Sequence, residues 1–236
     1  MTELKNAVVL VTGANGGLGR EFVAQALARG ATKVYATARV PRTAEEWGDE
    51  RIVPVTLDVT DPKSIAAVAD EADDVTVLIN NAGASTGASL HSGDLAAARG
   101  LFDTNFWGQL EVTNAFAPVL AANGGGAILN VLSVLSWLGV ADAYSATKAA
   151  FWSATNSQRL ALAKQGTQVT GLHLGYTDTP MAADVETEKN DPADVVAAAY
   201  DGLAADAQEI LADETSRKVK AGLAAPVEVL YASFTS

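Results

Sequence analysis

The chain has 236 residues, 49% of them hydrophobic, and a formal net charge of −12 at pH 7. This length and apolar content suit one α/β domain, and no linker, repeat or low-complexity tract divides residues 1–236, so we expect a single domain. The negative charge disfavours nucleic acid and anionic membranes as partners. With no cysteine and only two histidines, His91 and His173, far apart in the sequence, a metal site is not expected.

The apolar runs indicate where the protein resides. The run in "MTELKNAVVLVTGANGG" is too short for a signal-peptide core, and no later run approaches a membrane span, so a cytoplasmic location is expected. His173 lies in the apolar run "VTGLHLG" and is interpreted as a core or strand-end residue, and His91 as a loop residue. Neither histidine is given a role.

The first element, "NAVVLVTGANGGLGREFVAQALARG", predicts a strand, a glycine-rich turn and a helix. Glycines let the backbone approach a phosphate closely, and the start of the helix offers unpaired N–H groups and the positive end of a dipole. A merely tight turn is the alternative. The position between a first strand and a first helix favours a dinucleotide site.

A second strand, "KVYATAR", ends where NAD-binding folds place an acidic residue for the ribose hydroxyls, and none is present. Instead Arg39 and Arg42 follow. A guanidinium suits a 2′-phosphate through paired hydrogen bonds, so NADP (NADPH) is preferred and NAD is the less favoured cofactor. Solvated loop arginines are the alternative interpretation.

Later apolar runs at 51–59, 75–83, 125–133 and 167–175 are predicted strands, separated by helical patterns at about 62–71, 94–122 and 143–165. This alternation predicts an α/β fold: a single doubly wound, Rossmann-type domain with a mainly parallel sheet and helices on both faces. The ligand is then expected at the carboxyl ends of the strands.

Tyr144 and Lys148 stand four residues apart in "AYSATKAAFW", so on a helix they share one face. Taken alone, this spacing indicates only a pair on a packed or solvated face.

Several motifs in order resemble the short-chain dehydrogenase/reductase family over nearly the whole chain. They are "TGANGGLG", "LDVTD", "NNAG" at 80–83, "LFDTNFWG", "NVLSVLSW" and "YSATK". The resemblance implies the catalytic set Asn105, Ser133, Tyr144 and Lys148. It also implies cofactor contacts from Gly13, Asn15, Gly17, Leu18, Gly19, Arg39, Asp58, Val59, Asn81, Ala82, Gly83, Tyr144, Lys148, Gly175, Thr177 and Thr179.

The chain departs from the family pattern at three points. Ser133 lies slightly closer to Tyr144 than is usual, and Ser136 is a competing candidate; Ser133 is preferred because it falls at the end of the fifth strand. Leu174 and Gly175 replace the family's Pro-Gly, and Gly16 stands where NADP-specific relatives often carry a basic residue. The last departure weakens NADP without supporting NAD.

The expected chemistry is carbonyl reduction by hydride transfer, with Tyr144 as the acid and Ser133 as a second donor. An ammonium at about 4 Å, with an effective dielectric constant near 20, gives about 4 kcal/mol, which would lower the tyrosine pKa by about three before desolvation opposes it. Lys148 is the expected source of that charge. The resemblance further implies that Lys148 binds the nicotinamide ribose and that Asn105 supports a water-linked proton path.

Leu135, Trp137, Leu138, Tyr176 and Met181 lie on loops expected to face the nicotinamide, although each could simply pack its loop. They predict an apolar pocket for a small hydrophobic ketone or aldehyde. An NADP-dependent carbonyl reductase or secondary-alcohol dehydrogenase is therefore expected. A 3-oxoacyl thioester reductase and a non-catalytic nucleotide-sensing protein are the alternatives.

Helices at about 101–122 and 143–165 carry apolar residues around much of their circumference. Such helices need a second surface to bury them, and the family resemblance implies a four-helix interface. We expect a homodimer or homotetramer.

Overall fold

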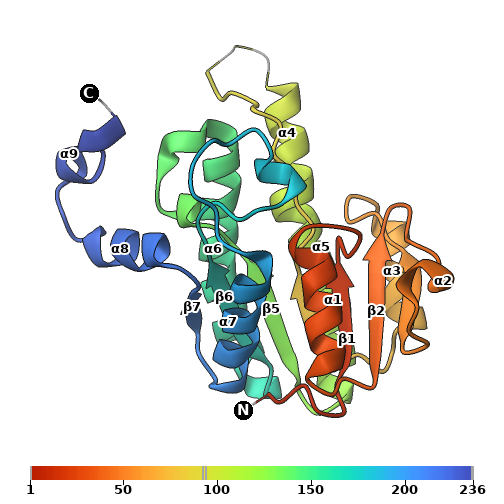
Figure 1. Cartoon of the computed structure of the whole chain (residues 1–236). Coiled ribbons are helices and arrows are strands. Elements are labelled where there is room, and N and C mark those ends of the chain that lie inside the picture. Colours follow the sequence, from red (N-terminus) through yellow and green to blue (C-terminus); the bar gives the residue numbers. More distant parts are fainter. Residues whose placement is uncertain (1, 92, 94, 235–236) are drawn as a thin grey trace.

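A computed structural model describes residues 2–91, 93 and 95–234. Its centre is a sheet of seven parallel strands in the order β3-β2-β1-β4-β5-β6-β7 (Figure 1). The strand order changes direction between β1 and β4, which in such sheets creates a ligand crevice at the carboxyl ends. The strands are β1 (Val8–Thr12), β2 (Lys33–Ala38), β3 (Ile52–Thr56), β4 (Val77–Asn80), β5 (Ala127–Val131), β6 (Gln168–His173) and β7 (Glu209–Leu211).

Helices cover both faces of the sheet, as the sequence predicts. Helices α1 and α7 pack together on one face, and α3 and α5 pack together on the other. The helices are α1 (Leu18–Ala28), α2 (Ala44–Trp47), α3 (Pro62–Glu71), α4 (Ala96–Phe102), α5 (Gly108–Ala122), α6 (Asp142–Leu162), α7 (Pro192–Ala204), α8 (Glu214–Gly222) and α9 (Val227–Leu230). The doubly wound fold class is confirmed, and every pairing of the described strands is parallel.

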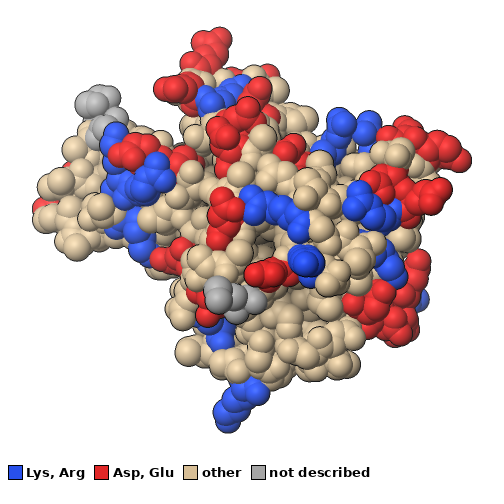
Figure 2. All heavy atoms as spheres, turned by 60° about the horizontal axis from the view of Figure 1, so that its bottom comes forward, with Lys and Arg blue, Asp and Glu red and all other residues tan. Residues whose placement is uncertain are grey.

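Both acidic and basic side chains lie on the face that Figure 2 shows, and acidic groups gather along its right edge. Within the described part of the chain, no helix is both long enough and apolar enough to cross a bilayer.

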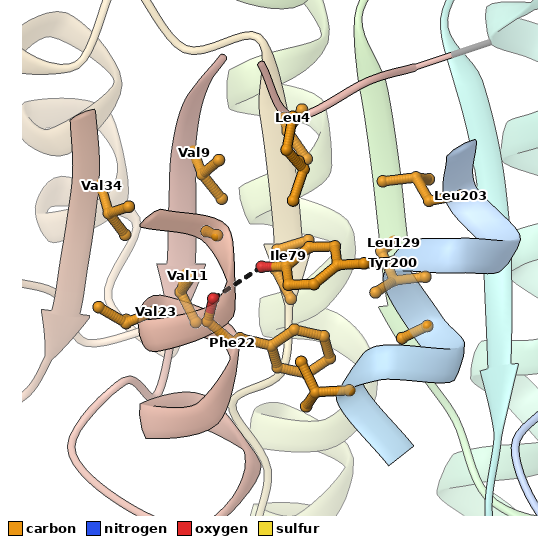
Figure 3. Close-up of a cluster of buried hydrophobic side chains, with 14 of the residues drawn as sticks. Leu4, Val9, Val11, Phe22, Val23, Val34, Ile79, Leu129, Tyr200 and Leu203 are labelled. Carbon is orange, nitrogen blue, oxygen red and sulfur yellow. Dashed lines mark hydrogen bonds between the residues drawn. The ribbon is translucent and has the colours of Figure 1, made fainter. Parts of the chain in front are cut away.

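The alternation of side chains along each strand divides the core into two layers. Val9 and Val11 face α1 and α7, whereas Leu10 between them faces α3 and α5. In the first layer the rings of Phe22 and Tyr200 meet edge to face with centroids 5.5 Å apart. The buried Tyr200 hydroxyl donates to the Phe22 carbonyl at 2.8 Å, so its polar atom is satisfied (Figure 3).

The structure differs from the sequence prediction in one helix and in several short elements. The helix predicted at 94–122 is interrupted by a π-helical turn at Asp103–Trp107, and its first residue, Asp94, lies outside the described residues. Strand β7 and helices α2, α8 and α9 were not predicted. β7 has only three residues and is defined by its pairing with β6, so its own sequence carries little strand periodicity.

Candidate active site

The glycine loop between β1 and α1 has the shape of a phosphate cradle. Gly13 and Gly17 have positive φ angles of 67° and 51°. A Cβ at Gly19 would clash with the carbonyl oxygen of Gly13, so only glycine fits there. Helix α1 starts at Leu18 without a side-chain cap; the Gly19 N–H donates to the Gly16 carbonyl at 3.0 Å, and a ligand can bind to the other N–H groups of the first turn. These features fit the pyrophosphate of a dinucleotide.

The predicted "NNAG" segment is tied to this loop by Thr12, whose side chain is fully buried. Its hydroxyl accepts hydrogen bonds from the N–H groups of Asn81 and Ala82, both at 2.9 Å. The Asn81 amide donates back to the Thr12 and Gly13 carbonyls at 2.8 and 3.2 Å. The sequence analysis gave Thr12 no role, although its place at the end of β1 could have suggested this one.

The two arginines after β2 lie next to the glycine loop. The Asn15 amide donates to the Val40 carbonyl at 2.6 Å, and its oxygen accepts from the Arg42 N–H at 3.2 Å. The Arg42 guanidinium lies 5.8 Å from the Trp47 ring centroid. Arg39 is exposed. The Asp58 pKa is held below its ordinary value, first by hydrogen bonds from Thr60 and further by the Arg39 charge, so Arg39 and Asp58 are neighbours.

The π-helical turn places Asn105 in a buried position beside the "NNAG" segment. Its side-chain oxygen accepts from the Ala84 N–H, and its amide donates to the Ala84 carbonyl, both at 2.8 Å. A Cβ at Gly83 would lie 3.4 Å from the Asn105 oxygen and 3.9 Å from Lys148 Nζ. Val59 is also buried, and its carbonyl packs against Gly108 so closely that a Cβ there would clash.

Ser133, Tyr144 and Lys148 come together between the end of β5 and the start of α6. The Ser133 side chain lies close enough to the Tyr144 phenol to act on its pKa as a hydrogen-bonding neighbour. Lys148 Nζ donates to the Val131 carbonyl at 2.9 Å and lies 5.8 Å from the Tyr144 ring centroid. The competing Ser136 hydroxyl is buried and has no hydrogen-bond partner among the described residues. The geometry therefore pairs Ser133 with Tyr144.

The expected lowering of the Tyr144 pKa by Lys148 is wrong for this structure. Burial of the phenol raises the Tyr144 pKa to about 12, and the hydrogen bond with Ser133 opposes this only in part. Burial also lowers the Lys148 pKa to about 8. The ammonium is directed to the Val131 carbonyl, so desolvation outweighs its attraction for a phenolate.

The segment after β6 lies over the glycine loop. A Cβ at Gly17 would be 3.2 Å from the side-chain carbons of Thr179. Thr177 is buried, and its hydroxyl donates to the Gly175 carbonyl at 3.2 Å. Asp213 fixes both ends of the segment, because one carboxylate oxygen accepts from the Gly175 N–H at 2.6 Å and from the Asn190 amide at 2.9 Å. Asp213 was not predicted as a site residue. Its place before a helical pattern is a signal only for the cap of that helix.

The predicted pocket residues divide into two groups. Leu135, Trp137 and Leu138 line a cavity of about 570 Å³ beside the start of α6. Tyr176 and Met181 are 50% and 52% exposed and are absent from its described lining, as is Tyr144. The cavity is therefore offset from the Tyr144 phenol. The substrate role of all five residues stays a prediction.

The sequence profile of the short chain dehydrogenase family matches residues 7–190. A short chain dehydrogenase from Burkholderia cenocepacia, solved in complex with NADP, has a TM-score of 0.91 and 35% identity, covering 99% of this chain and 100% of that chain.

Two curated relatives have named activities. A cis-4-hydroxycyclohexanecarboxylate dehydrogenase of Sinomonas cyclohexanicum is 35% identical over 200 residues, which cover 80% of this chain and 78% of that protein. A ketoacyl reductase of a Nostoc species is 30% identical over 197 residues, which cover 78% of this chain and 68% of that protein. Since the family profile extends from the glycine loop past the Thr177–Thr179 segment, the chain belongs to the short-chain dehydrogenase/reductase family of oxidoreductases.

Proposed function

We propose that the protein reduces a hydrophobic ketone or aldehyde to the alcohol with NADPH, reversibly. The observation that carries the proposal is the juxtaposition of the Ser133 hydroxyl and the Tyr144 phenol, with Lys148 one helical turn further on. A phenol and a hydroxyl placed together at the carboxyl ends of the strands can both donate to one substrate oxygen. The glycine cradle lies at the same edge of the sheet.

When bound, the reduced nicotinamide supplies the hydride that adds to the carbonyl carbon. Tyr144 gives its proton to the carbonyl oxygen, and Ser133 donates a hydrogen bond to that oxygen while negative charge builds there. Because the Tyr144 pKa is about 12, the phenol is protonated at neutral pH and ready to act as the acid. Oxidation of an alcohol must instead begin from the deprotonated phenol, so its rate should rise with pH.

Lys148 and Asn105 support this step. The Lys148 pKa of about 8 lets its amine gain and lose a proton close to neutral pH. A group that returns a proton to Tyr144 after each turnover needs this property. Following the family resemblance, Lys148 also holds the nicotinamide ribose, and Asn105 at the π-helical turn supports a water-linked path to it.

Arg39 supports NADPH over NADH. It is exposed, stands directly after β2, and is joined to the glycine loop through the hydrogen bond from Asn15 to the neighbouring Val40. A guanidinium there can bind a 2′-phosphate, which NADH lacks. The complex of the Burkholderia relative with NADP supports the same choice.

A small hydrophobic substrate is favoured by the apolar residues Leu135, Leu138, Tyr176 and Met181. The named substrate of the Sinomonas relative, a hydroxycyclohexanecarboxylate, is a secondary alcohol on an apolar ring. It supports the class of reaction, and the compound itself is one member of the panel to be tested.

The second candidate is a 3-oxoacyl thioester reductase, which the name of the Nostoc relative favours. A net charge of −12 opposes it, because an acidic surface repels an acidic acyl carrier. A non-catalytic nucleotide sensor is disfavoured because Ser133, Tyr144 and Lys148 are all present and gathered. NADPH oxidation measured with a panel of ketones, aldehydes and 3-oxoacyl thioesters distinguishes the three candidate functions, and the Tyr144→Phe protein serves as the negative control. A protein that turns over no compound of the panel would refute the proposed function.

We also propose a homodimer or homotetramer built on the helices at about 101–122 and 143–165. Large apolar side chains on these segments face solvent in the single chain: Trp107 is 53% exposed and Leu160 is 80% exposed. A second copy that covered them would remove this apolar area from water.

A further inference from the structure

A buried histidine that the proposed reaction does not use lies directly behind Ser133. His173 ends β6, its residue is 0% exposed, and its Nδ1 atom lies 3.1 Å from the Ser133 carbonyl oxygen. A carbonyl oxygen can only accept, so Nδ1 carries a hydrogen and donates it. The N–H groups of Leu132 and Val134 on either side bond to the β6 segment at 2.8 and 2.9 Å, so the ring completes the attachment of this backbone.

The other ring nitrogen of His173 faces a carboxylate. Its Nε2 atom lies 3.5 Å from Glu209 Oε1 on β7. Glu209 also accepts from Trp152 Nε1 at 2.9 Å and from Lys220 Nζ at 2.6 Å. His173, Lys220 and Trp152 together hold the Glu209 pKa far below its ordinary value. Nε2 has no hydrogen-bond partner among the described residues, so the defined hydrogen bond of this ring is the one from Nδ1 to the Ser133 carbonyl.

Aromatic contacts fix the plane of this ring. The Trp137 indole stacks on His173 with centroids 3.9 Å apart and planes 17° apart, and Trp152 meets Trp137 edge to face. Lys220 Nζ lies 5.0 Å from the Trp137 centroid, on the same cluster that binds Glu209. Arg159 on α6 adds positive charge near Glu209. The imidazole ring is therefore held between an indole face, a carboxylate and a backbone carbonyl.

We infer that His173 is a positioning residue that aims the Ser133 hydroxyl at Tyr144; the inference rests on the reductase function proposed above. The Ser133 hydroxyl accepts from the Leu135 N–H of its own turn at 3.1 Å, so the side chain follows the orientation of its backbone. The buried hydrogen bond from His173 Nδ1 to the Ser133 carbonyl fixes that orientation, because without it the carbonyl would lose this partner.

Two nearly isosteric variants separate positioning from packing. In His173→Asn the amide nitrogen replaces Nδ1 and keeps the donor to Ser133, whereas in His173→Gln it replaces Nε2 and faces only Glu209. Both variants lose the ring that stacks on Trp137. We expect kcat to be about tenfold or more lower in His173→Gln than in His173→Asn, with similar KM for NADPH, because misplaced catalytic groups cost about that much. Equal kcat values in the two folded variants would overturn the inference.

A measurement on the unsubstituted ring tests the same inference without any turnover. The chain has two histidines, so ¹⁵N spectra with and without His91→Asn assign the His173 signals directly. A hydrogen on Nδ1 at neutral pH is expected, because Nδ1 faces a carbonyl oxygen. An Nδ1 atom without hydrogen would overturn the inference. Absence of carbonyl reduction together with a hydrogen on Nδ1 would refute the proposed function alone.

Discussion

Replacing Lys148 with methionine should make the protein more stable at neutral pH while it loses activity. The Lys148 amine is buried, and among the described residues it donates a hydrogen bond to the Val131 carbonyl. Methionine is a flexible apolar side chain of similar length, so it can fill the same space without a charge. Proteins often keep such destabilising groups where the chemistry requires them.

The magnitude follows from the pKa of this amine, which burial lowers from 10.5 to about 8. At about 1.36 kcal/mol per pKa unit, burying the charged form costs about 3 kcal/mol. The lost hydrogen bond to Val131 and the carbonyl left unpaired offset about 1–2 kcal/mol of the gain. The free energy of unfolding should therefore rise by about 1–2 kcal/mol near neutral pH, which for a chain of this size raises Tm by about 2–6 °C.

The pH dependence distinguishes this cause from better packing. Between the folded pKa of about 8 and the unfolded value of 10.5, the unfolded wild type binds more protons than the folded form, so its stability rises with pH. Lys148→Met lacks this rise, and its advantage should shrink by about 2 kcal/mol between about pH 7 and about pH 9.5.

Urea unfolding followed by tryptophan fluorescence at both pH values measures the change. The matched control is Lys164→Met at an exposed lysine, where the free energy of unfolding should change by less than about 0.5 kcal/mol at either pH. A Lys148→Met protein that is less stable than wild type near neutral pH, or whose difference does not vary with pH, would refute the reasoning. NADPH binding and turnover should both weaken in this variant.

Four further outcomes are expected. Arg39→Ala should raise KM for NADPH and leave KM for NADH nearly unchanged, and equal effects on both cofactors would contradict the 2′-phosphate assignment. The matched control is Arg51→Ala, just before β3 at the opposite end of the sheet, which should change neither KM value. Tyr144→Phe should fold and bind cofactor but lose at least about 10²-fold in kcat; a folded variant that keeps a tenth of wild-type turnover would remove the phenol from the mechanism. In the wild type, kcat/KM for reduction should fall as pH rises through about 8, where Lys148 loses its charge, and a flat profile would argue against that role. Sedimentation at micromolar concentration should show a dimer or tetramer, and a species of only 24.3 kDa would contradict the proposed interface at Trp107 and Leu160.

The sequence by itself determined the fold class and the residues that gather at the site. Strand and helix periodicities are local properties, and parallel strands linked by helices bring their carboxyl ends to one edge. Short motifs at those ends therefore predict a shared site, and the structure places Gly13, Asn81, Asn105 and Tyr144 around it. A Cβ at Gly19 would clash with Gly13, so the loop requires glycine at this position, and the glycine pattern predicts the loop from the sequence alone.

Only the tertiary structure decided the protonation of the site and the supports behind it. Burial comes from residues distant in the chain, so the opposite pKa shifts of Tyr144 and Lys148 could not be derived from their spacing, which suggested only mutual attraction. The same holds for His173, which the sequence placed in the core without a role. Its partners Ser133 and Glu209 lie on segments next to β6 in the sheet, and only that pairing brings a carbonyl and a carboxylate to the two nitrogens of one ring.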